Sequence, residues 1–238
     1  MKILAVIGNY GKEQLNYLNQ IIIELKSFKK YDVTVIVNSN IEIDNPLIDQ
    51  VNIPKVSDNK LILASCGQVI YDNMNKYDGY IFSENDMLWK EHHLDNHFKY
   101  SAVLPENRIP GLIRYEIDPN GNRTSYVDFH CNNWKSSSKE TYDKYKFCQV
   151  NNVHQGCYFL TNKQLNYASA HNRDHFTTAT RSSSGYGILE SSNTDLFDFS
   201  NWEKVICISE FESNIIHHMP NIYVVGANGR KRLALFCL

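Results

Sequence analysis

Apolar residues along the first forty positions form a strand–helix–strand pattern. Residues 2–8 are an apolar run of the kind found in strands buried on both faces, and 9–11 form a turn. Residues 12–28 carry apolar side chains at the spacing of an amphipathic helix: Leu15, Leu18, Ile21, Ile22, Leu25 and Phe28. A second β-branched run follows at 31–37. The pattern predicts a βαβ unit, and therefore a parallel sheet with a right-handed crossover.

The rest of the chain alternates predicted strands and helices. We expect strands at 79–83, 110–117, 125–129, 156–160 and 204–208, and one short strand within 41–58. We expect helices at 61–76, 90–100, 162–171, 188–198 and 210–218, a hairpin turn at 118–122 and a polar loop at 172–187. No linker or repeat interrupts this order, so the sequence predicts one α/β domain over residues 1–238.

Charge and apolar content exclude several classes of protein. The 238 residues are 42% hydrophobic, with a net charge of −2 and a pI near 6.5. Nucleic-acid binders and polybasic membrane anchors both need an excess of basic residues. No stretch approaches the roughly 20 apolar residues of a membrane helix, and the N-terminal run is too short for a signal peptide. We therefore expect a cytoplasmic protein with no nucleic-acid partner and no membrane segment.

The six cysteines lie at positions 66, 131, 148, 157, 207 and 237. No two have CxxC spacing, which argues against a zinc ribbon or a redox pair. Several lie in apolar runs, where a reduced, buried thiol is usual.

The first candidate for chemistry is the triplet Glu84-Asn85-Asp86, which follows the strand predicted at 79–83. Alternate side chains of an extended chain share a face, so we expect the two carboxylates to point the same way. Ligands bind at the carboxyl ends of strands in open parallel sheets, and a divalent cation bridging to phosphates would offset the repulsion between two acids. Such triplets are also common on solvated turns, and this alternative stays open.

The second candidate is the pair His217-His218, which precedes Met219-Pro220. One interpretation is the end of a helix, where histidines interact favourably with the dipole and a proline stops the helix. The other interpretation is a metal ligand. Adjacent side chains point in different directions, so one of the two would bind the ion, and we favour His217.

The third candidate is Glu190, at the start of the helix predicted at 188–198. A carboxylate positioned by a helix beside a polar loop is suited to accept a proton from a substrate hydroxyl. The same carboxylate would interact favourably with the helix dipole without any catalytic role.

Together these motifs resemble the GT-A glycosyltransferases. The resemblance rests on the βαβ start, the acid-x-acid triplet, a Gly-Cys-Tyr-Phe-Leu-Thr strand, a Gly-x-Leu-Glu-Ser helix start, and a Val-Ile-Cys-Ile-Ser strand followed by a His-His-x-Pro-Asn turn. It covers residues 2–223 and is greatest to small enzymes of large DNA viruses, such as chloroviruses, and of some bacteria. It implies a single GT-A-like (Rossmann-like) domain with a mixed, mostly parallel central sheet flanked by helices. Its nucleotide-binding part would cover about 1–105 and its acceptor and catalytic part about 106–238.

The resemblance also implies roles for individual residues. Asp86 would bind Mn²⁺ or Mg²⁺, with Glu84 as a second ligand or ribose contact. The family usually has Asp at the first position of the triplet, where this sequence has Glu84. His217 or His218 would complete the metal site. The nucleotide would contact these residues: Gly8, Asn9 and Tyr10 (base and ribose), Asn38 (base edge), Gln68 (diphosphate), and Glu84 and Asn85 of the triplet.

The implied reaction moves a sugar from a nucleotide-diphosphate sugar, by preference UDP-linked, to a hydroxyl of a glycan or glycoprotein. Glu190 would be the general base of an inverting transfer, with Asp195 or Asp128 as the next candidates. Without a carboxylate on that face of the sugar, the reaction would be retaining.

Four further polar residues have two interpretations each. Arg114 and Glu116 share a face of a predicted strand, and they either pair with each other or line the sugar pocket. His154 and Gln155 precede a predicted strand, and they either contact the donor sugar or make ordinary hydrogen bonds.

Aromatic residues and a histidine cluster are also ambiguous. Trp89 and Trp134 either stack on sugar rings or belong to the core. His92, His93 and His97 lie on a predicted helix, where we expect a solvated face rather than a zinc site, because no third ligand has a suitable spacing.

Two other functions remain as alternatives. A nucleotidyltransferase of similar fold usually has a Gly-rich loop with basic residues after its first strand, whereas here only Gly8, Gly11 and Lys12 are present. A non-catalytic nucleotide-sugar-binding module is the other rival, and the presence of two acids, a histidine and Glu190 argues against it.

Overall fold

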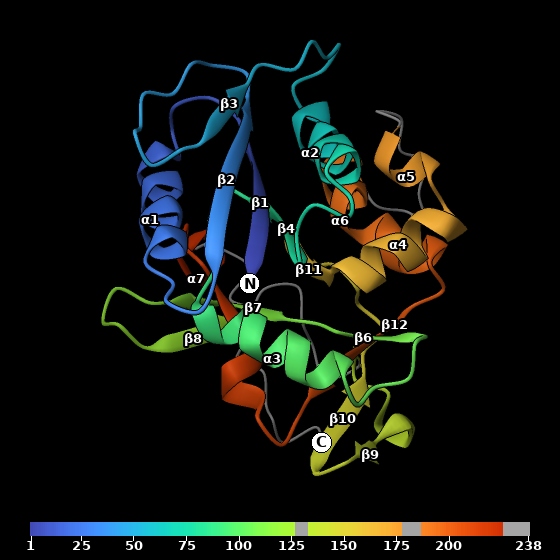
Figure 1. Cartoon of the computed structure of the whole chain (residues 1–238). Coiled ribbons are helices and arrows are strands. Elements are labelled where there is room, and N and C mark those ends of the chain that lie inside the picture. The colour runs from blue at the N-terminus through green and yellow to red at the C-terminus, as the bar shows by residue number, and fades with distance from the viewer. Residues whose placement is uncertain (127–132, 178–186, 226–238) are drawn as a thin grey trace. The chain divides into compact units, whose positions relative to one another are not determined.

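The computed structural model describes residues 1–126, 133–177 and 187–225 (Figure 1). The chain divides into two compact units, each assembled from two segments. Unit 1 consists of residues 1–91 and 156–201, and unit 2 of residues 92–155 and the described residues from 202 onward. The division of function near residue 105 stays a prediction.

Unit 1 is built on a five-stranded sheet with the order β11-β4-β1-β2-β3. Its strands are β1 (Lys2–Asn9), β2 (Asp32–Ser39), β3 (Gln50–Asn52), β4 (Gly79–Glu84) and β11 (Cys157–Thr161). β1 is parallel to β2 and β4, β2 is parallel to β3, and β11 is antiparallel to β4. Residues 3–7 of β1 are completely buried, as a central strand covered on both faces requires. The predicted α/β class with a mixed, mostly parallel sheet flanked by helices is confirmed.

Helices cover both faces of this sheet (Figure 1). α1 (Leu15–Lys26) joins β1 to β2 and buries four residues of its predicted apolar stripe, Leu18, Ile21, Ile22 and Leu25. α2 (Leu61–Asp72) packs on β1 and also contacts α5 (Asp174–Thr177) and α6 (Ile188–Phe199). α4 (Asn162–His171) begins at a capping box between Thr161 and Gln164, in which each side chain bonds the other's backbone N–H. The helix that starts near Glu190 is therefore part of the layer over this sheet.

The strands described in unit 2 pair in two groups. One is the sheet β6-β12-β10-β9, formed by β6 (Arg108–Pro110), β12 (Glu203–Cys207), β10 (Tyr145–Gln149) and β9 (Glu140–Tyr142). In the other, β7 (Ile113–Ile117) is parallel to β13 (Ile215–His218) and antiparallel to β8 (Arg123–Tyr126). Helix α3 (Glu91–Ser101) buries Tyr100 in a core cluster with residues of β10 and β12. The short helices of unit 2 are η2 (Ser136–Ser138), η3 (Phe211–Asn214) and α7 (Ile222–Val225), whereas the short strand β5 (Met87–Leu88) belongs to unit 1.

The helix predicted at 210–218 is wrong. The segment is the short helix η3 followed by strand β13, whose residues Ile215 and Ile216 are both buried. Pairing with β7 decides the conformation, because a short apolar run contains no period that separates helix from strand.

The single strand predicted at 110–117 is also wrong. It is divided into β6 and β7 at Gly111-Leu112, where the Gly111 N–H donates to Val205 O at 2.9 Å. The hairpin turn at 118–122 is confirmed, since the Asp118 N–H donates to Asn122 O at 2.8 Å. The return strand predicted at 125–129 begins earlier, at Arg123, and residues 127–129 lie outside the described residues.

The predicted thiol state is confirmed for four cysteines, which are buried and free: Cys66, Cys148, Cys157 and Cys207. Cys131 and Cys237 lie outside the described residues. Within the described ranges, no helix combines the length and the apolar character needed to cross a membrane.

The expectation of a solvated histidine face on α3 is wrong for two of its three residues. His93 and His97 are buried, whereas His92 is exposed. The His93 ring nitrogen Nε2 lies 3.1 Å from Ile215 O, so this histidine fixes the start of β13. Helix periodicity alone cannot tell a polar stripe that faces solvent from one that meets backbone carbonyls.

Candidate functional site

The acid triplet begins at the carboxyl edge of the unit 1 sheet. In the strand register, Glu84 lies beside Gly8, and Gly8 lies beside Asn38. Three predicted nucleotide contacts from separate parts of the chain therefore form one row across β4, β1 and β2, at the edge where open α/β sheets bind ligands. A Cβ on Gly8 would lie 2.3 Å from Leu63 Cδ2, so α2 packs directly against the backbone here.

The two acids do not continue one strand. β4 ends at Glu84, and Asn85 and Asp86 form a turn before β5. The expectation that the triplet is extended, from which strand alternation predicted a shared face for the two carboxylates, is therefore wrong. Asp86 is buried, and its Oδ2 accepts a hydrogen bond of 3.4 Å from Gln14 Nε2, at the start of α1. Sequence reasoning missed Gln14, which no local pattern connects to the triplet.

Asn85 links this turn to the end of β1. Its Nδ2 donates to Asn9 Oδ1 at 2.7 Å, and Asn9 Nδ2 donates in turn to Ser39 Oγ and Gly11 O, both at 3.1 Å. Asn9 and Asn85 are both buried. These two predicted nucleotide contacts thus hold together the ends of β1, β2 and β4, whereas the neighbouring Tyr10 is 60% exposed.

Asn38 is also held by neighbouring side chains. Its Nδ2 donates to Ser65 Oγ at 2.8 Å, and its Oδ1 accepts from Asn52 Nδ2 at 2.9 Å. A polar chain therefore runs from β3 through β2 to α2 along the carboxyl edge. Gln68 lies further along α2, where its Nε2 donates to Asp72 Oδ1 at 2.7 Å.

Glu190 is the third residue of α6 and lies close to the helix start. A Cβ on Gly187, the residue before the helix, would lie 2.6 Å from Glu190 Oε2, so the carboxylate folds back over the first turn. This geometry suits a partner of the helix dipole, and it also suits a base held at a helix start. Gly185 and Tyr186, in the loop before the helix, lie outside the described residues.

α6 is connected to the acid triplet through Asn193. Its Nδ2 donates to Glu84 Oε1 at 3.3 Å, across 109 residues of sequence. Residues three apart on a helix are neighbours on one face, so Glu190 lies one turn from this contact. Sequence reasoning missed Asn193, although its i+3 spacing from Glu190 was a usable signal. Of the two alternative bases, Asp195 is buried in the same helix, and Asp128 lies outside the described residues.

Glu116 forms the centre of a buried polar cluster in unit 2. Its Oε1 lies 2.7 Å from His218 Nδ1, and its Oε2 accepts from the Tyr223 N–H at 2.9 Å. The Glu116 side chain has no exposed surface. A carboxylate bonded to one ring nitrogen is the arrangement that orients metal-binding histidines in many proteins. Arg114, two positions earlier in β7, is also buried.

His217 has a different environment from its neighbour. Its ring stacks on Tyr115 with centroids 5.1 Å apart, and its Nε2 lies 3.2 Å from Asn221 Oδ1. It is partly buried, and the two histidines alternate along strand β13.

The predicted sugar contacts His154 and Gln155 lie in a segment that is held by a buried lysine. Lys204 Nζ lies 3.4 Å from Val153 O and 3.5 Å from His154 O. Gln155 Oε1 accepts from the Leu112 N–H at 2.9 Å. No local pattern singles out Lys204, because a lysine in a strand normally keeps its charged end in solvent.

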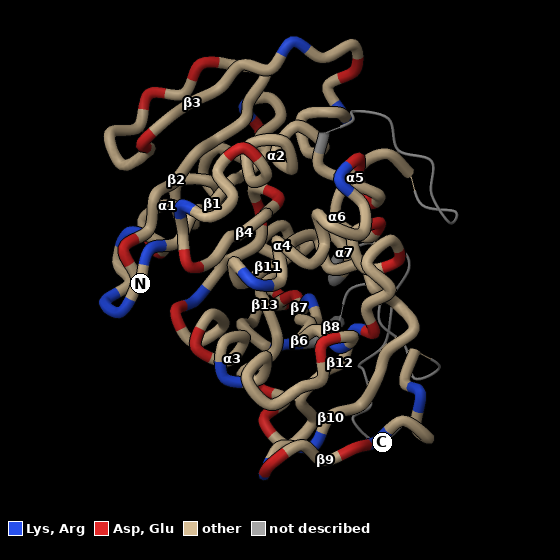
Figure 2. The backbone as a smooth tube through the Cα atoms, turned by 45° about the vertical axis from the view of Figure 1, so that its right-hand side comes forward, with Lys and Arg blue, Asp and Glu red and all other residues tan. Residues whose placement is uncertain are grey.

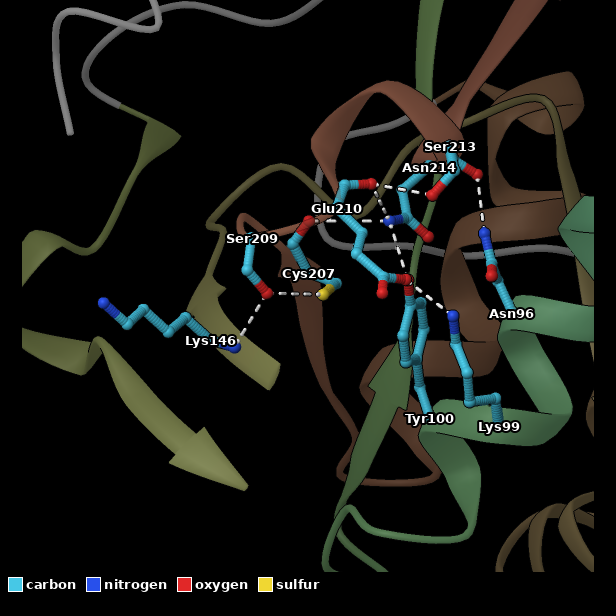
Figure 3. Close-up of polar contacts among 9 residues, drawn as sticks. All are labelled: Asn96, Lys99, Tyr100, Lys146, Cys207, Ser209, Glu210, Ser213 and Asn214. Atoms are coloured by element: carbon cyan, nitrogen blue, oxygen red, sulfur yellow. Dashed lines mark hydrogen bonds and ion pairs between the residues drawn. The ribbon is translucent and has the colours of Figure 1, made fainter. Parts of the chain in front are cut away.

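A polar network fixes the connection between β12 and β13 to α3 (Figure 3). Glu210 Oε2 accepts from Lys99 Nζ and from Tyr100 Oη, both at 2.6 Å. Asn214 Nδ2 lies 2.7 Å from Glu210 O and 3.3 Å from Tyr100 Oη. Burial, together with the Glu210 contact, raises the pKa of Tyr100, so its hydroxyl remains a donor. The network therefore holds the segment that leads into strand β13.

Both tryptophans considered for sugar stacking are buried. Trp89 Nε1 donates to Ser83 Oγ at 3.1 Å in unit 1. Trp134 belongs to a core cluster of unit 2 with Phe211 and Ile215. The structure supports the core interpretation for both.

Charged residues are interspersed along the described chain rather than gathered in one segment (Figure 2). Among residues 1–126, 133–177 and 187–225, no three His, Cys, Asp or Glu side chains form a group that could hold a metal by itself. Glu84 and Asp86 belong to unit 1, and His217 and His218 to unit 2. Their joint action on one ion stays a prediction.

Comparisons with known proteins add little to this description. No protein-family model matches the chain, and no curated protein matches its sequence. Among solved structures, it is similar to S. aureus TarS residues 1–349, with a TM-score of 0.48 and 9% identity. The match covers 94% of this chain and 63% of the TarS chain, so this chain spans less than two thirds of that length. A likeness of this degree identifies neither a family nor an activity.

Proposed function

We propose that the chain is a metal-dependent glycosyltransferase that moves a sugar from a UDP-linked donor to a hydroxyl of a glycan or glycoprotein. The observation that carries this proposal is the bond between Asn193 and Glu84, which joins the helix of Glu190 to the carboxyl edge of the sheet. One packed unit thus contains two carboxylates suited to hold a cation and a third suited to accept a proton. Transfer of a group from a phosphate to a hydroxyl needs both kinds of assistance.

Glu84 and Asp86 fit Mn²⁺ or Mg²⁺ because both supply carboxylate oxygens, the ligands that these hard ions prefer. Mg²⁺ commonly binds through one or two carboxylates together with substrate phosphates, so a group of three protein ligands is not required. The bound ion would offset the negative charge that develops on the departing nucleoside diphosphate. Asp86 is the first ligand in this proposal and Glu84 the second.

His218 is a better candidate for the histidine ligand than His217, which the sequence favoured. Its Nδ1 is oriented by the buried carboxylate of Glu116, and such carboxylate–histidine pairs fix the ring and raise the basicity of the other nitrogen. His217 is instead stacked on Tyr115 and close to Asn221, which suits a structural role.

The remaining residues bind and orient. The Asn9–Asn85 bond holds the turn that carries Asp86, and Gly8 allows α2 to pack directly on the end of β1. Glu190 accepts the proton of the acceptor hydroxyl as the new bond forms, in a single displacement that inverts the anomeric carbon. Asn38 and Tyr10 contact the base and ribose in this proposal.

Binding of UDP to the whole chain with and without Mn²⁺ tests the proposal. Asp86→Asn should lower the affinity for UDP with Mn²⁺ by at least about tenfold and leave the weak metal-free binding unchanged. Asp32→Asn is the matched control, because Asp32 is an exposed residue at the opposite end of the same sheet, where β2 begins. Equal affinity of wild type and Asp86→Asn would remove Asp86 from the site. A wild type that binds no nucleoside diphosphate in a panel of UDP, GDP and CDP would contradict the proposed function.

A further inference from the structure

Asn193 is a completely buried amide in the second turn of α6. The polar residues around it satisfy their hydroxyls within the helix, since Ser191, Ser192 and Thr194 donate to carbonyls four residues earlier at 2.8–3.0 Å. Asn193 instead directs its Nδ2 out of the helix to Glu84 Oε1, at 3.3 Å. Its side chain therefore serves the strand edge rather than the helix.

Glu84 is fixed from its backbone as well as from its side chain. Its N–H donates to Gly156 O at 3.0 Å, and its strand position is set by the register with Gly8. A donor on one carboxylate oxygen selects the orientation of the whole group. Asn193 therefore acts on the direction of the Glu84 carboxylate, while the strand sets its location.

We propose that Asn193 is a positioning residue that orients Glu84 for cation binding and keeps α6 in register with β4. This inference rests on the proposed function, because it gives Glu84 a ligand role. An amide is suited to the task, since it donates without adding charge. Aspartate at the same position would face Glu84 with a second negative charge, which costs stability unless a cation lies nearby.

A double-mutant cycle on protein stability tests the contact without reference to activity. The cycle compares Asn193→Ala, Glu84→Ala and the double variant by urea unfolding. If the two side chains interact, the effect of the double variant on the unfolding equilibrium constant should differ by about twofold or more from the product of the two single effects, as for residues in contact. A double effect equal to that product would overturn the inference.

Metal-dependent binding then tests the positioning role. Asn193→Ala should weaken the affinity of the UDP complex for Mn²⁺ by about 10-fold or more, as removal of groups that orient metal ligands does elsewhere. Ser192→Ala is the matched control, because it removes a buried hydroxyl bond of 3.0 Å to Ile188 O in the same helix turn. It should lower stability without changing the Mn²⁺ affinity.

Asn193→Asp provides a readout that a purely structural role would not change. Without metal, the melting temperature of this variant should be lower than that of wild type. Addition of Mn²⁺ should raise the melting temperature of the variant by more degrees than that of wild type. Equal Mn²⁺ affinity for wild type and Asn193→Ala would overturn the inference and leave the proposed function standing. A wild type that binds no nucleotide with Mn²⁺ would instead refute the proposed function, and the positioning role with it.

Discussion

Replacing Glu190 by glutamine removes one negative charge and keeps the length of the side chain, so it separates the two interpretations of this residue. Glu190 is the third residue of α6, partly exposed, with its carboxylate close to Gly187 before the helix. As a partner of the helix dipole it contributes about 0.3–1 kcal/mol to the free energy of unfolding. As a general base it contributes a factor of about 10²–10⁴ to the rate, or about 3–5.5 kcal/mol of activation free energy.

The two magnitudes predict distinct outcomes for Glu190→Gln. The melting temperature should fall by no more than about 2–4 °C, because a change of 1 kcal/mol has that effect in a chain of this length. The initial rate of transfer from a UDP-sugar should fall by at least about 100-fold, while the affinity for UDP with Mn²⁺ is retained. Glu91→Gln is the matched control, since Glu91 is also in the first turn of a helix, α3, and should keep the wild-type rate.

One result would refute the assignment of the base. If Glu190→Gln transfers sugar within about threefold of the wild-type rate and shows only the small loss of stability, its carboxylate is a partner of the helix dipole alone. Asp195→Asn would then be the next variant, because Asp195 lies buried in the same helix.

Three further predictions concern the stability of unit 2. His218→Ala should lower the free energy of unfolding in urea by roughly 3–5 kcal/mol, because it leaves the fully buried Glu116 carboxylate without this partner, whereas His217→Ala should cost less than about 2 kcal/mol. Gly111→Ala should lower the free energy of unfolding by roughly 1–3 kcal/mol, since the new Cβ would lie 2.4 Å from Cε of the buried Lys204. An unchanged urea midpoint would contradict this close packing of Lys204 against Gly111. The hydrogen bond from Lys99 holds the pKa of the Glu210 carboxyl below its ordinary value of 4.5. The stability that this carboxylate contributes is therefore fully present above pH 4.5 and is lost as the pH falls through the lowered pKa. The difference in urea midpoint between wild type and Glu210→Gln should therefore be constant from pH 6 to 7 and shrink below about pH 4.5, and a difference that grows in acid would show the sign to be wrong.

Local patterns predicted most of unit 1 correctly. The run at 2–8, the amphipathic stripe at 12–28 and the run at 31–37 each determine an element without help from distant residues, and β1, α1 and β2 follow them closely. The helix at 162–171 agrees with α4 to the residue, because the capping box at Thr161 defines its start locally. The carboxyl edge of the sheet could be located for the same reason, since it is where these runs end.

The sequence failed where pairing between distant segments decides the conformation. Residues 215–218 form a strand because β7 lies beside them, 102 residues away at the first register pair (215 − 113). The turn at Asn85 and Asp86 follows from contacts with Asn9 and Gln14, which are more than seventy residues distant. The strands β9 and β10 were missed, since their alternation of apolar and polar residues is short. Hydrogen bonds between side chains of this separation leave no periodic signal in one sequence.

The buried polar turn of α6 gives the strongest reason to regard this helix as functional. Residues 191–195 read Ser-Ser-Asn-Thr-Asp, and all five are buried. A helix that only filled space would carry apolar side chains there, because a buried polar group without a partner costs about 1–3 kcal/mol. The three hydroxyls avoid this cost by bonding within the helix, but Asn193 avoids it by bonding to Glu84 at the carboxyl edge of the sheet. Asn193 thus connects this helix to that edge, and this is why we regard the acid in its first turn, Glu190, as the best candidate for the base in the proposed function.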